Sequence, residues 1–273
     1  MTIEKMKFNG TFRDYQQRVI DNSGQYLKDG KINIVAAPGS GKTVLGLELI
    51  RKLGKPCIIF SPTAAIREQW GYRLRDLFLE DKADFPLLFS SDPHDIKPIT
   101  SITYQSLYTA VAKISEKSEE GIDCSDMDIF KAVKENGIKT ICLDEAHHLK
   151  NEWQKALEKF INGLNSDVKI ISLTATPPYD SDASEWERYI NVCGEIDEEI
   201  FIPELVAQNT LCPHQDYVYF NFPSSQEAET IKAHRQNAAA ALDEMGKLGF
   251  WEEISKQIEQ ERNYDKLYSH AKE

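Results

Sequence analysis

The chain has 273 residues, of which 41% are hydrophobic and 28% are charged, as in a globular protein that forms one large domain or one domain with a helical appendage. A formal net charge of −12 argues against nucleic-acid binding over the whole surface but permits a narrow basic groove. No apolar run approaches the ~20 residues that span a bilayer, and no secretory signal is visible. The five cysteines include no CxxC pair, so we expect a cytoplasmic protein with no membrane segment, disulfide framework or zinc site.

The first predicted helix runs over residues 11–28 and carries Tyr15-Gln16 ahead of the first strand. The Gln16 amide can make two hydrogen bonds, which is what reading an adenine base requires. A surface glutamine on an amphipathic helix would give the same pattern. The residues alone leave both interpretations open.

Residues 31–43, KINIVAAPGSGKT, have the pattern of a phosphate-binding P-loop, or Walker A motif. A β-branched run predicts a buried strand, a glycine-rich loop follows, and Lys42-Thr43 begins an amphipathic helix. The glycines let backbone N–H groups approach phosphate oxygens, and the helix start adds its own unpaired N–H groups. Lys42 can reach the β- and γ-phosphates, and the Thr43 hydroxyl can ligate Mg²⁺. The expected ATP-binding residues of this loop are Pro38, Gly39, Ser40, Gly41, Lys42 and Thr43.

Apolar runs predict strands at residues 57–60 and 98–103, and a short strand at 87–89 within a loop rich in Asp and Pro. Thr63 is expected to cap a helix over residues 64–78. The polar residues 116–128 are expected to form an exposed loop.

The buried strand predicted at residues 140–143 ends in two adjacent carboxylates, Asp144 and Glu145. In an open α/β sheet, ligands bind at the carboxyl ends of the strands, where the P-loop also lies. Asp144 would then face the Mg²⁺ held by Thr43, and Glu145 would orient and deprotonate the attacking water. The structural alternative is a helix start enriched in acidic residues.

A further strand over residues 168–173 ends in Thr174-Ala175-Thr176. The threonine hydroxyls can hydrogen-bond to Glu145, to His147 or to a water on the phosphate side, or these small residues simply end the strand before a Pro pair. Beyond it we expect strands at residues 200–203 and 216–222, a capping box at Ser224–Glu227, and helices over 224–245 and 250–267. These elements divide the chain into a domain of residues 1–223 and a helical tail or linker of residues 224–273.

In order, these segments resemble the motifs of the first motor domain of superfamily 2 helicases, the DEAD/DEAH-box group. The similarity is greatest to the branch shared with type III restriction subunits and DNA-repair translocases. The segments are the adenine-reading Tyr15-Gln16, motif I at residues 36–43, motif Ia at 61–70, the TYQSL segment at 103–107, motif II at 143–147, which reads LDEAH, and motif III at 173–177.

The resemblance implies an α/β, RecA-like P-loop NTPase fold with a mostly parallel sheet between helices and a C-terminal helical segment. It implies an ATP- and Mg²⁺-dependent helicase or translocase in which Lys42 and Glu145 are catalytic, Thr43 and Asp144 hold Mg²⁺, and Gln16 contacts adenine. It also implies that Thr63, Arg67 and Thr103 touch the nucleic-acid backbone and that His147, Thr174 and Thr176 couple hydrolysis to movement.

The resemblance also implies a second RecA-like domain, in cis or in trans, for which this chain has no counterpart. Since that domain supplies arginine fingers worth ~10³–10⁵ in rate, the isolated chain should hydrolyse ATP weakly. Two alternatives remain from the residues: a P-loop ATPase that does not act on nucleic acid, which the acidic charge favours, and a nucleotide-gated scaffold. Whether the nucleic acid is DNA or RNA is open.

Overall fold

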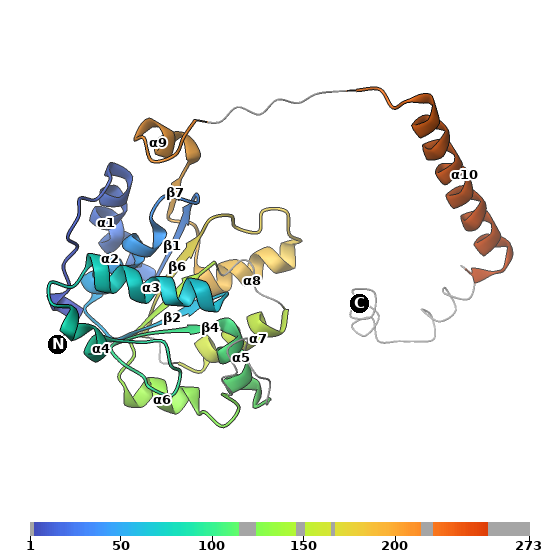
Figure 1. Cartoon of the computed structure of the whole chain (residues 1–273). Helices are drawn as coiled ribbons and strands as arrows, with labels where there is room; N and C mark the ends of the chain where they lie inside the picture. The colour runs from blue at the N-terminus through green and yellow to red at the C-terminus, as the bar shows by residue number, and fades with distance from the viewer. Residues whose placement is uncertain (1–2, 115–123, 146–150, 165–166, 214–220, 251–273) are drawn as a thin grey trace. The chain divides into compact units, whose positions relative to one another are not determined.

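Short runs of β-branched and other apolar residues form the sheet at the centre of the unit of residues 1–213 (Figure 1). The computed structural model describes residues 3–114, 124–145, 151–164, 167–213 and 221–250. Within these residues, seven strands form one sheet of order β3-β4-β2-β5-β6-β1-β7, and every pairing is parallel. The strands are β1 (Lys31–Ala36), β2 (Cys57–Ser61), β3 (Phe89–Ser90), β4 (Ile99–Thr103), β5 (Thr140–Asp144), β6 (Lys169–Thr174) and β7 (Glu198–Ile200).

The chain divides into two compact units, residues 1–213 and residues 214–273, and each is described by itself. The predicted boundary after residue 223 stays a prediction. The helices of the first unit are α1 (Asp14–Tyr26), α2 (Lys42–Leu53), α3 (Ala64–Leu77), α4 (Phe85–Leu88), α5 (Tyr104–Ala112), α6 (Ile129–Glu135), α7 (Asn151–Asn162), α8 (Ala183–Cys193) and α9 (Ile202–Ala207), with 3₁₀ turns at Ile3–Lys5, Leu27–Asp29 and Lys82–Asp84.

Helices cover both faces of the sheet, so its central strands are buried and rich in apolar residues, with buried polar residues such as Asn33 and Ser101 among them. Successive β2 side chains alternate between two hydrophobic clusters: Ile59 packs with residues of α1, α2 and α3, whereas Ile58 and Phe60 pack with residues of α5, α6, α7 and α8. This three-layer arrangement is the predicted RecA-like α/β fold. Cys57 and Cys142 are buried free thiols within β2 and β5.

The second unit contains α10 (Ser225–Lys247) in its described part. The predicted capping box is present: Glu227 N–H donates to Ser224 Oγ, and Ser224 N–H donates to the Glu227 carboxylate. The helix predicted at residues 250–267 and most of the strand predicted at 216–222 lie outside the described residues. No helix in the described part of the chain combines the length and apolar character that crossing a bilayer requires.

Two strand predictions are wrong at one end. Residues 87 and 88 lie in α4, and strand β3 begins only at Phe89. At residues 200–203, β7 ends at Ile200 and α9 begins at Ile202. Pro203 is tolerated there because the first turn of a helix needs no N–H bond.

Three further features were not predicted. Helices α6 and α8 are absent from the expected elements, and Cys124 and Met127, which lie in the expected loop 116–128, are buried in the core. Residues 116–123 of that loop lie outside the described residues.

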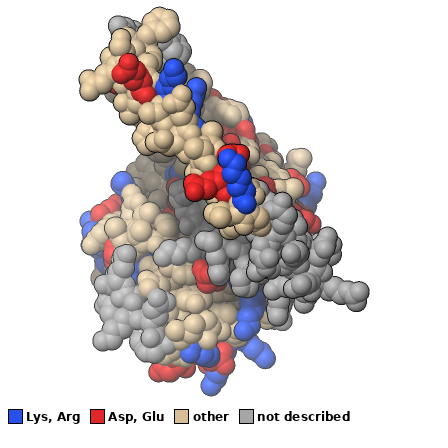
Figure 2. Space-filling view, turned by 90° about the vertical axis from the view of Figure 1, so that its right-hand side faces the viewer, with Lys and Arg blue, Asp and Glu red and all other residues tan. Residues whose placement is uncertain are grey.

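Lysine and arginine side chains lie beside aspartates and glutamates on the face shown in Figure 2. The formal net charge of the whole chain is −12. Any binding of a polyanion would therefore depend on a local groove rather than on the overall field.

Gly46 in α2 allows two elements to approach closely. A Cβ atom at this position would lie 2.6 Å from Trp70 Cη2 and 2.7 Å from Leu173 Cδ1. Because both neighbours are fully buried, neither has free space to move into.

We expect Gly46→Ala to lower the free energy of unfolding by about 1–3 kcal/mol, because overpacking in a dense core outweighs the gain in helix propensity. The matched control is Gly24→Ala in α1, where an added Cβ has nothing within 4 Å and should raise stability by about 0.5–1 kcal/mol. Urea denaturation measures both. Equal stabilisation by the two changes would contradict the close packing at Gly46.

Candidate functional site

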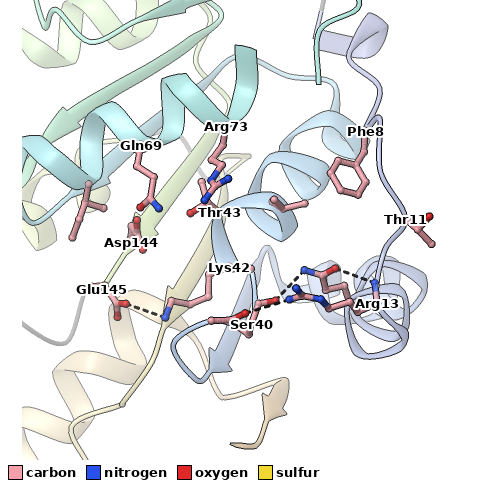
Figure 3. A pocket seen from close by; sticks show the side chains of 15 residues that line it. Phe8, Thr11, Arg13, Ser40, Lys42, Thr43, Gln69, Arg73, Asp144 and Glu145 are labelled. Atoms are coloured by element: carbon pink, nitrogen blue, oxygen red, sulfur yellow. Dashed lines mark hydrogen bonds and ion pairs between the residues drawn. The ribbon is translucent and has the colours of Figure 1, made fainter. Parts of the chain in front are cut away.

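Three neighbouring strands end at one edge of the sheet and place three polar segments together. The order β5-β6-β1 makes β6 the central strand of the three, with Asp144 in register with Leu173 and Val35 in register with Thr174. A cavity of about 460 Å³ opens at this edge. Figure 3 shows Lys42, Thr43, Asp144 and Glu145 around it.

The loop after β1 depends on two glycines with left-handed backbone angles. Gly39 has φ of 86° and Gly41, the residue before α2, has φ of 84°. A Cβ on Gly41 would also lie 2.6 Å from Gln16 Nε2. The loop conformation therefore excludes any side chain at position 41.

Lys42 bridges the loop and the end of β5. Its Nζ forms an ion pair of 3.0 Å with Glu145 Oε1 and donates a hydrogen bond of 3.1 Å to Ala36 O. Both charged side chains are largely shielded from solvent, with 14% and 19% of their surface exposed. The ammonium group thus lies at the mouth of the loop.

Glu145 has a left-handed backbone, with φ of 53°, which is unusual for a residue with a side chain. Its N–H donates to Leu173 O at 2.8 Å, and its Oε2 accepts from Ala175 N–H at 3.0 Å and from Thr174 Oγ1 at 3.4 Å. These contacts hold the strained residue and confirm the expected bond between Thr174 and Glu145. Thr174 Oγ1 also lies 3.4 Å from Thr176 O, although the Thr176 side chain is exposed.

Asp144 is 5% exposed at the end of β5. Its Oδ2 accepts a hydrogen bond of 2.8 Å from Trp70 Nε1, and its backbone O accepts one of 3.1 Å from the Tyr104 hydroxyl. Burial raises the pKa of Asp144 to about 6, while the Trp70 bond and the charge of Lys42 lower it and the charge of Glu145 raises it.

The donor set at this point suits a hard cation. Oδ1 of Asp144 has neither a hydrogen bond nor an ion pair within the described residues, and the Thr43 hydroxyl lines the same cavity. Mg²⁺ prefers carboxylate and hydroxyl oxygens together with phosphates of a substrate. A buried carboxylate with one unoccupied oxygen beside a phosphate loop fits that chemistry.

Gln16 is 4% exposed, so the surface-residue interpretation of it is wrong. Its Nε2 donates to Ser40 O at 3.0 Å, and its Oε1 accepts from Arg13 N–H at 3.0 Å. The amide therefore joins the start of α1 to the phosphate loop. Gln16 lines the cavity, and its contact with adenine stays a prediction.

A sequence model of one family, described as type III restriction enzyme, res subunit, matches residues 9–179. The chain belongs to this family. With the RecA-like fold, membership identifies a superfamily 2 motor domain of the helicase or translocase type, matching a first RecA-like domain. Such ATPases in general use ATP and Mg²⁺.

The structure is also similar to three solved structures. The Hef helicase domain of Pyrococcus furiosus has 19% identity and a TM-score of 0.46 over 70% of this chain and 39% of that one. The UvsW helicase of bacteriophage T4 has 16% identity and a TM-score of 0.47 over 70% of this chain and 62% of that one. The SWI2/SNF2 ATPase core of Sulfolobus solfataricus in complex with dsDNA has 18% identity and a TM-score of 0.46 over 71% of this chain and 38% of that one. The chain thus spans less than two thirds of each. No curated protein matches it.

The three residues expected to touch nucleic acid make contacts within the protein: two of them cap helices and the third forms an ion pair. Thr63 is exposed and caps α3, its Oγ1 accepting from Ile66 N–H at 3.3 Å, as predicted. Thr103 is buried and caps α5 through Ser106 N–H at 3.1 Å. Arg67 is 5% exposed and its Nη2 contacts Glu68 Oε1 at 2.6 Å. Their nucleic-acid contacts stay predictions, and His147 lies outside the described residues.

Several cavity residues had no assigned role from the sequence. Gln69 and Arg73 point from α3 toward Thr43 and Asp144 (Figure 3). With Ile66 they follow a helical spacing of three and four residues, so they share one face of α3. The sequence shows this spacing, but it does not show which face of α3 lies against the P-loop. Phe8 and Arg13 also line the cavity.

We expect Asp144→Asn to raise the free energy of unfolding of the nucleotide-free protein by about 1–3 kcal/mol at pH 7.5 in EDTA. An acid with a raised pKa binds its proton more tightly when folded, so stability falls as the pH rises from about 4 through about 6. The amide avoids that loss and can still accept the Trp70 bond. The gain should therefore vanish near pH 4.

Urea denaturation between pH 4 and pH 8 measures this effect, with Asp180→Asn as the control because Asp180 is exposed. A gain that does not change with pH would contradict the raised pKa of Asp144.

Proposed function

We propose that this domain is the N-terminal ATP-binding motor of an ATP-dependent DNA or RNA helicase or translocase, which hydrolyses ATP to drive movement on nucleic acid. The observation that carries the proposal is the ion pair between Lys42 and Glu145. It brings the ammonium group of Lys42, from the loop after β1, within 3.0 Å of the Glu145 carboxylate at the end of β5. That carboxylate is held in turn by Thr174 and Ala175 at the end of β6. Once ATP binds, Lys42 would leave Glu145 for the phosphates, and the carboxylate would face the attacking water.

The loop would bind the phosphates of ATP. Backbone N–H groups at Gly39–Gly41 and the start of α2 would surround the β-phosphate, and Lys42 would exchange Glu145 Oε1 for phosphate oxygens. Thr43 and Asp144 would hold Mg²⁺, which supplies charge neutralisation on the β- and γ-phosphates when bound. Gln16 would contact adenine.

Glu145 would act as the general base. Once Lys42 turns to the phosphates, Oε1 would accept a proton from water, while Oε2 keeps its bonds to Ala175 N–H and Thr174 Oγ1. The water oxygen would attack the γ-phosphorus, the bond to the β–γ bridging oxygen would break, and ADP and phosphate would leave.

The contacts of Glu145 also support the coupling proposal. Thr174 and Ala175 bond directly to the proposed base, so a change at the γ-phosphate would reach the segment that continues to Thr176. We propose that this segment and His147 transmit the change to nucleic acid at Thr63, Arg67 and Thr103. A second RecA-like domain, in cis or in trans, would complete the site, and the free cysteines suit the reducing cytoplasm.

We expect Glu145→Gln to lower the rate of ATP turnover by about 10²–10⁴-fold, the usual contribution of a general base, while nucleotide binding is kept. Phosphate release and calorimetric titration of ADP measure the two properties. Glu135→Gln, which changes an exposed glutamate on α6, is the matched control. Turnover that persists in the Glu145 variant would show that another group is the base.

The proposed function itself is tested by ATP hydrolysis in the presence of single- and double-stranded DNA and RNA. The assay uses this chain and the longest natural protein that contains it, with Lys42→Ala as the control. We expect one nucleic acid to stimulate turnover, and Lys42→Ala to abolish the stimulated rate. Turnover that no nucleic acid changes would point to an ATPase with another substrate, and binding without turnover would point to a nucleotide-gated scaffold.

A further inference from the structure

Trp70 connects α3 to the proposed metal site through one hydrogen bond to Asp144. The indole is 0% exposed, and its Nε1 lies 2.8 Å from Asp144 Oδ2. An indole N–H can only donate, so Asp144 Oδ2 must be the acceptor and the carboxylate must turn this oxygen toward the indole. In the described residues, it is the single hydrogen bond made by the Asp144 side chain.

The packing around the indole fixes its position. Gly46 leaves the space that the ring occupies, because a Cβ there would lie 2.6 Å from Trp70 Cη2. Leu173, the register partner of Asp144, contacts the same space from β6. The ring therefore lies against the helix that follows the phosphate loop, and it cannot shift without moving α2 or β6.

The main chain of Asp144 is held separately. The Tyr104 hydroxyl donates to Asp144 O at 3.1 Å, which fixes the end of β5 but leaves the carboxylate free to rotate. Only the Trp70 bond restricts that rotation among the described contacts. With Oδ2 occupied, Oδ1 is the oxygen left for a cation in the cavity that Thr43 lines.

We propose that Trp70 is a positioning residue for metal binding: its indole N–H holds Asp144 Oδ2 so that Oδ1 is presented to the Mg²⁺ of the bound nucleotide. The inference rests on the proposed function, because it takes Asp144 as a Mg²⁺ ligand. Hydrogen-bond partners of metal ligands commonly change metal affinity by about 10–100-fold when they are lost.

The test is Trp70→Phe, which keeps an aromatic ring but removes the donor. Binding of ADP is measured by calorimetry in EDTA and over a series of Mg²⁺ concentrations. We expect the Mg²⁺ concentration for half-maximal enhancement of ADP binding to rise about 10–100-fold, while ADP affinity in EDTA stays within about twofold of the unmodified protein.

Tyr104→Phe is the matched control, since it removes a buried hydrogen bond to the same residue without touching the carboxylate. It should lower the thermal midpoint but leave the Mg²⁺ requirement unchanged. If Trp70→Phe does not fold, benzothienylalanine at position 70 replaces the N–H group by sulfur in a ring of nearly the same shape.

The outcomes separate the inference from the proposed function. If the unmodified protein shows no Mg²⁺-dependent ADP binding, the proposed function fails. If it does, and removal of the donor leaves the Mg²⁺ requirement unchanged or shifts it no more than Tyr104→Phe does, the positioning role of Trp70 is wrong.

Discussion

The ion pair between Lys42 and Glu145 depends on the order of three parallel strands. Lys42 follows the strand on one side of β6 and Glu145 follows the strand on the other side, so the pair spans the end of β6. That position explains why Thr174 and Ala175 supply the bonds to the carboxylate. It also explains why Glu145 can adopt a left-handed backbone: Leu173 and Ala175 satisfy its polar groups on both sides of the strained residue.

The sequence predicted the central strands because they are buried on both faces and read as short runs rich in β-branched and other apolar residues. The secondary-structure predictions are wrong where an element is too short to show a repeat, or where an acidic composition hides the helical spacing of the apolar residues. Leu87 and Leu88 lie in a four-residue helix that shows no full helical repeat. Helix α8 lies in an acidic stretch, yet Trp186, Tyr189 and Cys193 follow a helical spacing and pack on the core.

For the site, the sequence predicted the groups that motifs place at strand ends: Lys42, Thr43, Asp144 and Glu145 all line one cavity. It did not predict the contacts that organise those groups. Trp70 and Asp144 are separated by 74 positions, and only the sheet order, which places β5 next to β2, brings α3 over the end of β5. The sequence also could not predict the hydrogen bonds of the Gln16 amide to Arg13 and Ser40. A buried glutamine and an exposed one have the same local sequence pattern.

The missing side chain at Gly46 has a consequence for related sequences. Since the indole at position 70 fills the space that Gly46 leaves open, the residues at these positions cannot vary independently. A relative with a larger residue at 46 needs a smaller one at 70, and it then loses the N–H donor to the aspartate. Paired substitution across an alignment would therefore trace a steric condition on the proposed metal binding, between two positions that do not line the cavity.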